Sequence, residues 1–161
     1  MPGWSNFFVG ELGAAAALAG LLFVSVSMNQ ARILALGRMA DRGLETLAML
    51  FLVMVVASLG LVPGQPLRWL GAEILVVGAA TLAWLIPVQQ RYMRLLDPIH
   101  LRRSARMAWF TRAAIGIFVI GGLGLATLGQ AWALYLLPPG ILLVFAAVGL
   151  NAWVLLIEIN R

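Results

Sequence analysis

The sequence predicts an all-α integral membrane protein with five transmembrane helices, the N-terminus outside and the C-terminus in the cytoplasm. Three observations support this prediction: an apolar composition, apolar runs of span length, and the placement of the arginines. Hydrophobic residues make up 63% of the 161 residues, and the mean hydropathy is +0.99, whereas soluble domains are roughly 45–50% apolar. A soluble fold of this size could not hide so much apolar surface.

Five apolar runs have the length of a membrane span. A helix needs ~20 apolar residues to cross a hydrocarbon core about 30 Å thick. The predicted spans cover approximately residues 7–28, 44–62, 70–88, 108–128 and 135–157. The chain is therefore expected to form a single transmembrane helical domain over residues 1–161.

The arginines set the predicted orientation, because basic residues are retained on the cytoplasmic side of short membrane connections. All basic residues of the chain are Arg. Most of them lie in the first connection, in the third connection or at the C-terminus: Arg32, Arg38, Arg42, Arg91, Arg94, Arg102, Arg103, Arg106 and Arg161. Only Arg68 lies in the second connection. The first and third connections are therefore expected to be cytoplasmic.

The first predicted helix is rich in small residues at helical spacing. They are Gly10, Gly13, Ala14, Ala17 and Gly20. In lipid, such spacings allow two helix backbones to approach closely. This face packs either against a neighbouring helix of the same chain or against the same helix of another copy around an oligomer axis, and the sequence leaves both alternatives possible.

A seven-residue repeat also runs along the first helix and places polar and apolar residues on one side. The residues on that side are Glu11, Leu18, Ser25, Asn29 and Arg32. The order of acid, apolar constriction, hydroxyl, amide and arginine suits the lining of a pore formed by several first helices. The alternative is ordinary helix packing, with the last three residues lying where the helix leaves the bilayer.

The second and third predicted helices form a hairpin closed by the Pro- and Gly-rich turn at residues 62–66. Glu73, near the outer end of the third helix, lies at a depth similar to that of Glu11. The two carboxylates are a candidate acidic outer mouth that attracts cations, with Arg68 as a candidate partner for one of them. The alternative is that each acid interacts with the positive end of its own helix.

The fourth and fifth predicted helices form a second hairpin with its bend at Gly129-Gln130. Pro138-Pro139 marks the beginning of the regular part of the fifth helix. Arg112 lies one turn into the fourth helix and Glu158 one turn before the end of the fifth. Antiparallel neighbours bring these depths together, so we expect a structural ion pair between Arg112 and Glu158.

Four segments of the first three helices carry a family resemblance: Phe7-Phe8-Val9-Gly10, residues 18–27, residues 61–65 and Leu70-Gly71-Ala72-Glu73. On these segments the chain resembles a family of small, functionally uncharacterised bacterial multi-spanning integral membrane proteins. The resemblance implies a multi-pass protein of the bacterial cytoplasmic (inner) membrane. It implies no activity and no functional residues.

Several classes of function are not expected. The chain has no cysteine, and His100 has no cysteine or carboxylate cluster around it, so neither a metal site nor a cofactor is predicted. No nucleophile–base pair or phosphate-binding loop is present, so we expect no enzyme. The net charge is +5, but no basic run carries interleaved aromatics, so nucleic acid is not an expected partner. The arginines are expected to meet anionic lipid headgroups instead.

Two functions remain after these exclusions. The first is a homo-oligomeric ion channel or pore whose first helix lines the axis, with Glu11 at the outer mouth. The second is an accessory or scaffold subunit that packs against another protein in a larger membrane complex. The expected partners are therefore the lipid bilayer, further copies of the chain and, in the second case, a different membrane protein.

Overall fold

The computed structural model describes residues 3–28, 38–94 and 98–159, with the side chains of residues 38, 98–100 and 154–159 excepted. The described chain is all-helical. Its elements are α1 (Trp4–Met28), α3 (Arg38–Gly60), α4 (Leu67–Met93), α5 (Pro98–Leu128), the short 3₁₀ helix η1 (Ala131–Leu136) and α6 (Leu137–Ile159). Within this part of the chain, five helices are long and apolar enough to cross a membrane. This confirms the predicted all-α class and the presence of five candidate spans.

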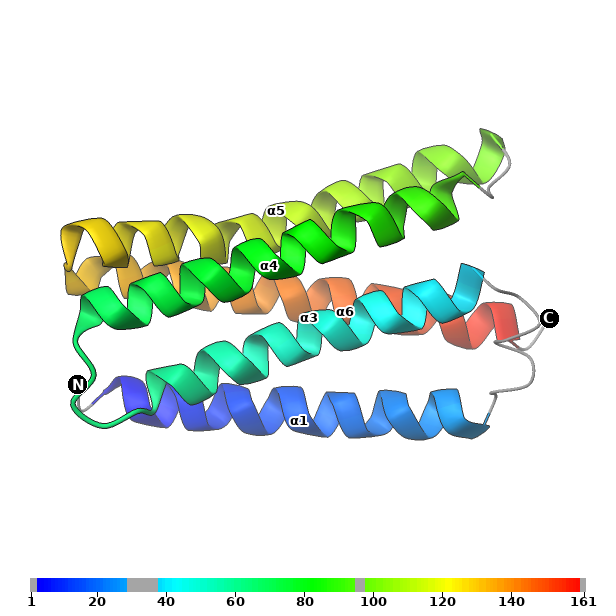
Figure 1. Ribbon diagram of the computed structural model, residues 1–161. Coiled ribbons are helices and arrows are strands. Elements are labelled where there is room, and N and C mark those ends of the chain that lie inside the picture. The colour runs from blue at the N-terminus through cyan, green and yellow to red at the C-terminus, as the bar shows by residue number, and fades with distance from the viewer. Residues whose placement is uncertain (1–2, 29–37, 95–97, 160–161) are drawn as a thin grey trace.

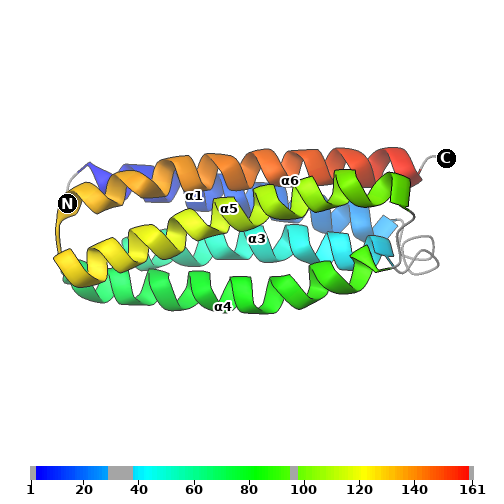
Figure 2. The ribbon, with the colours of Figure 1, turned by 90° about the horizontal axis from the view of Figure 1, so that it is seen from above.

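The helices lie side by side along their length (Figure 1). One end of the helix bundle holds the N-terminus, the α3–α4 turn and the α5–η1 turn, and we call it the N-terminal end (Figure 1). The C-terminus lies at the opposite end (Figure 1). We call this second end the basic end; the exposed arginines Arg91, Arg94, Arg102, Arg103 and Arg106 lie on the helix segments that reach it. α3 packs against α1, α4 and α6, and α4 packs most extensively against α5. Seen from above, α6 lies over α1, and α4 lies along the opposite edge of the bundle (Figure 2).

Glycine makes the α4–α5 contact close. A Cβ atom added at Gly122 of α5 would lie 2.6 Å from the backbone nitrogen of Leu75. A Cβ atom added at Gly71 of α4 would overlap the backbone of Ala126. The two backbones therefore touch in the halves of α4 and α5 that lie nearer the N-terminus of the chain, as small residues permit in lipid.

Glycine also closes the two turns at the N-terminal end. Gly64 follows α3 with φ 68°, and Gly129 follows α5 with φ 63°. Both lie in the left-handed region that glycine adopts without steric cost, and both occupy the predicted bends. The chain then forms η1 before α6 begins, so the start of the regular helix at Pro138-Pro139 agrees with the prediction. Proline fits there because a first helical turn does not need its missing N–H.

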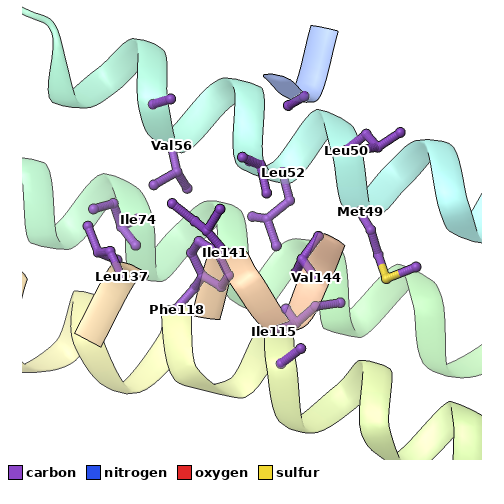
Figure 3. Packing of buried hydrophobic residues seen from close by; sticks show 14 of the residues in the cluster. Met49, Leu50, Leu52, Val56, Ile74, Ile115, Phe118, Leu137, Ile141 and Val144 are labelled. Carbon is purple, nitrogen blue, oxygen red and sulfur yellow. The ribbon is translucent and has the colours of Figure 1, made fainter. Parts of the chain in front are cut away.

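The core lies between α3, α4, α5 and α6 (Figure 3). Buried side chains of all four helices interdigitate there: Leu52, Val56, Ile74, Ile115, Phe118, Leu137, Ile141 and Val144. α1 lies outside this four-helix core and packs mainly against α3 (Figure 1). The peripheral position of α1 leaves much of its surface facing outward.

The contact between α1 and α3 uses one narrow face of α1. Its buried residues are Phe8, Ala15 and Leu22, spaced by seven positions. At the N-terminal end the Phe8 ring lies over Gly60, where an added Cβ atom would come within 2.5 Å of the ring. Trp4 then meets Tyr135 of η1 edge-on, with ring centroids 5.1 Å apart. These aromatic contacts fix the N-terminal end of α1 on the bundle.

Candidate functional site

Buried polar side chains from three helices meet toward the basic end. We call this group the polar layer; it consists of Glu45 and Thr46 of α3, Gln89 and Tyr92 of α4, and Thr111 and Arg112 of α5. Glu45 is 2% exposed and Gln89 is fully buried. Ionisable groups inside membrane spans are costly unless they have partners, so their contacts decide what they do.

Glu45 and Gln89 are the centre of the polar layer. The Gln89 Nε2 group donates to Glu45 Oε1 at 2.8 Å, and the Tyr92 hydroxyl donates to Glu45 Oε2 at 3.1 Å. The Arg112 Nε group donates to Gln89 Oε1 at 2.7 Å. Both carboxyl oxygens and both ends of the Gln89 amide are therefore engaged. The result is one hydrogen-bonded chain across α3, α4 and α5.

A second arginine extends the polar layer toward the basic end. Arg42 lies over the Tyr92 ring, 5.6 Å from its centroid, and its Nη2 group donates to Ser104 Oγ at 2.7 Å. Its carbonyl oxygen accepts a 2.8 Å bond from the Thr46 hydroxyl. The guanidinium of Arg112 lies 5.6 Å from the Trp109 ring centroid. Positive charge thus flanks the buried carboxylate on two sides.

Helical spacing explains how the helices place these groups together. Residues three or seven positions apart share one face of an α-helix. Arg42 and Glu45 have the first spacing on α3, and Gln89 and Tyr92 have it on α4. The layer is thus formed from polar residues on the inward face of each helix, and the described helices bring those faces together.

The polar layer is closed rather than open to a substrate. Its hydrogen-bonding groups are almost wholly shielded from solvent. Among the described residues, two buried atoms of α5 and α6, Thr111 Oγ1 and Asn151 Nδ2, have no hydrogen-bond partner. Interhelical hydrogen bonds such as those from Gln89 to Glu45 and from Arg112 to Gln89 stabilise helix association in lipid. The arrangement therefore holds three helices in register.

Sequence reasoning missed Glu45, Gln89 and Tyr92. Glu45 could have been found, because it is a carboxylate inside a predicted span, as Glu11 and Glu73 are. Gln89 and Tyr92 lie at the end of an apolar run, where polar residues are ordinary. Their role depends on which faces of α3 and α4 meet, which the predicted hairpin between these helices does not specify.

Of the predicted Arg112–Glu158 ion pair, only the Arg112 side chain belongs to the described residues. Arg112 is partly buried, donates to Gln89 and lies over Trp109. Glu158 lies in α6, but its side chain is outside the described residues. An Arg112–Glu158 pair therefore stays a prediction.

The two carboxylates of the predicted outer mouth have different surroundings. Glu73 accepts a hydrogen bond from Gln65 in the α3–α4 turn. Glu11 is partly buried on α1 and forms no hydrogen bond or ion pair within the described part of the chain. α1 packs mainly against α3, whereas Glu73 belongs to α4. Arg68 is exposed, and its side chain lies against Gly129.

The predicted pore-lining stripe lies on one flank of α1. Glu11 and Ser25 are partly buried, and Leu18 is 37% exposed. Asn29 and Arg32 lie outside the described residues. At ~100° per residue, the stripe is about 60° from the face that packs on α3. It therefore borders the bundle without being enclosed by it.

The small-residue face of α1 points away from the bundle. An added Cβ atom at Gly10, Gly13 or Gly20 would meet nothing within 4 Å. Ala17, between them, is exposed, and Leu21 beside them is 69% exposed. This face lies about 180° from the α3 contact. We call it the outer α1 face; nothing in the described chain covers it.

The described residues contain no group of three or more His, Cys, Asp or Glu that could hold a metal ion. No family model, curated protein or solved structure matches this chain.

Proposed function

We propose that the protein is a non-enzymatic, homo-oligomeric membrane channel. Copies associate along the outer α1 face, and the stripe that begins with Glu11 lines a polar path. The observation that carries the proposal is that Glu11, on a peripheral span, has no polar partner within the described residues and lies next to an uncovered face of small residues.

The depth of Glu11 makes its lack of a partner significant. Trp4 and Tyr135 form an aromatic pair of the kind that lies at a membrane interface. Glu11 is seven residues further along α1, or about 10 Å deeper at 1.5 Å per residue. Charged groups at such depths normally face a protein interior or a water-filled cavity. The described part of one chain supplies no polar partner to Glu11, but an assembly can supply a protein interior or a water-filled cavity.

The angular order of the α1 faces fits such an assembly. The α3 contact lies on one side of the stripe and the outer α1 face lies on the other. When a neighbouring copy covers the outer α1 face, the stripe lies between that contact and the contact with α3. A ring of copies would then direct Glu11, Leu18 and Ser25 toward a shared axis. Leu18 would form the apolar constriction, where dewetting can gate a pore.

The polar layer has a supporting part in this proposal. Its central side chains, Glu45 and Gln89, are buried and bonded to each other, so we do not place the ion path there. It keeps α3 in register with α4 and α5. α1 can then associate with other copies while the four-helix core stays unchanged.

Membrane placement follows from charge. We place the basic end in the cytoplasm and the N-terminal end outside, because Lys and Arg are retained on the cytoplasmic side. Glu11 then lies toward the outer mouth, where a ring of carboxylates favours cations. The family resemblance adds the bacterial inner membrane as the location.

Reconstitution tests the proposal directly. Purified protein in liposomes should pass monovalent cations under an applied potential, and Glu11→Gln should lower the conductance. Glu73→Gln is the matched control, because Glu73 is another span carboxylate but is bonded to Gln65. Absence of flux from a protein that is oligomeric in nanodiscs would refute the channel. Equal conductance of wild type and Glu11→Gln would refute the role of the stripe.

The second candidate is an accessory subunit of a larger membrane complex. It is favoured by the same uncovered face, because small residues accept any closely packed helix and not only another α1. A protein that is monomeric in mild detergent and co-purifies with one constant membrane partner would support it. Substitution of Gly13 by Ile should then release that partner.

A further inference from the structure

A pocket of about 390 Å³ lies between α5 and α6 toward the basic end. Its lining consists of Arg103, Arg106, Met107 and Phe110 of α5 and Leu150 of α6. The four α5 residues follow the spacing i, i+3, i+4 and i+7, so they share one helix face. The pocket is separate from the polar layer, to which α5 contributes Thr111 and Arg112.

The lining changes from charged to apolar along the helix axis. Arg103 and Arg106 are exposed and lie nearer the basic end. Met107 and Phe110 are partly buried and lie further into the span, where Leu150 faces them across the pocket. A phospholipid has the same order, with an anionic phosphate at the interface and an acyl chain below it.

The arginines have donors available for such a ligand. Within the described side chains, neither Arg103 nor Arg106 forms a hydrogen bond or ion pair. Arg42 and Arg112, by contrast, are bonded within the bundle. The planar guanidinium presents several N–H donors and binds phosphate oxygens in a bidentate manner. Basic pockets between spanning helices are suited to anionic lipid headgroups.

We infer that this pocket binds one anionic glycerophospholipid. Arg103 and Arg106 hold the headgroup phosphate, and an acyl chain lies against Met107, Phe110 and Leu150. The bound lipid bridges α5 and α6. The inference is independent of the channel proposal, because it holds for a single copy of the chain.

Native mass spectrometry of the purified protein in mild detergent tests the site. The probes are phosphatidylglycerol and phosphatidylcholine with identical acyl chains. Wild type should retain phosphatidylglycerol, and the double variant Arg103→Gln/Arg106→Gln should lose about thirtyfold in apparent affinity, as expected when two arginines near an anionic headgroup are removed. The double variant Arg91→Gln/Arg94→Gln is the matched control, because its arginines are also exposed at the basic end but do not line the pocket.

Two further arms separate a lipid site from general attraction of anions. Leu150→Trp fills the apolar part of the pocket and should weaken phosphatidylglycerol binding while leaving both arginines in place. Inorganic phosphate and glycerol 3-phosphate should not displace the lipid at equal concentration. Equal lipid loss in the two double arginine variants would overturn the site, as would displacement by inorganic phosphate.

Discussion

Glu45 of α3 and Gln89 of α4 are 44 positions apart in the chain, yet their side chains share a 2.8 Å hydrogen bond in the interior of the bundle. Apolar helices in lipid can slide past one another at little cost, because tails and side chains are equally apolar. A buried hydrogen bond between two helices has one satisfactory register. The pair therefore specifies how α3 lies against α4.

Removal of the Glu45 side chain should destabilise the bundle. Glu45→Ala leaves the Gln89 amide and the Tyr92 hydroxyl without their acceptor, at a cost on the order of 1–3 kcal/mol for each buried donor. Thermal unfolding of purified protein in one detergent measures the effect. Glu73→Ala is the control, since Glu73 also accepts a hydrogen bond but is only partly buried. A shift for Glu73→Ala as large as that for Glu45→Ala would contradict a special role for the polar layer.

Close packing of α4 on α5 should make Gly122 intolerant of any side chain. In Gly122→Ala the new Cβ atom meets the backbone of Leu75 at 2.6 Å, so the helices must separate, at a cost of about 1–3 kcal/mol. Gly116→Ala on the same helix is the matched control, because nothing lies within 4 Å of an added Cβ there. Gly116→Ala should stabilise by up to about 1 kcal/mol through helix propensity. Similar melting temperatures for the two variants would show that the α4–α5 contact is looser than described.

The outer α1 face should be the contact between copies. The chain has no cysteine, so single thiols can be introduced without background. Gly13→Cys should give dimers with a short bifunctional thiol reagent in membranes, because its surroundings are open in one chain. Val76→Cys, on α4 and also exposed, should give few. Equal yields at both positions would indicate random collision and remove support for association through α1.

Orientation can be read from thiol labelling in intact cells. A membrane-impermeant maleimide should label Gln130→Cys, which lies at the N-terminal end of the bundle, without permeabilisation. Leu101→Cys, near the basic end, should be labelled only after the membrane is opened. Both residues are exposed. The reverse pattern would invert the orientation and with it the outer position of Glu11.

The candidate site was only partly foreseeable from sequence. Glu11 and the small residues of the first helix are visible in one segment, because their spacing is local. The seven-residue spacing predicts that Glu11, Leu18 and Ser25 share a flank, and the helical geometry of α1 agrees. The polar layer could not be predicted from the sequence, because its members are isolated polar residues on three different segments. Arg112 was expected to meet Glu158 through a depth argument, and this pair stays a prediction because the Glu158 side chain lies outside the described residues.

Local hydropathy and helix length alone specify an all-α chain with five candidate spans, because a segment long and apolar enough to enter a bilayer shows this in its own residues. Packing between distant segments decides the rest. It places α1 at the edge of a four-helix core, joins Glu45 to Gln89, and leaves Gly13 open while Gly122 is enclosed. These outcomes depend on which helix faces meet. In lipid that choice is made by close backbone contact and interhelical hydrogen bonds rather than by hydrophobicity.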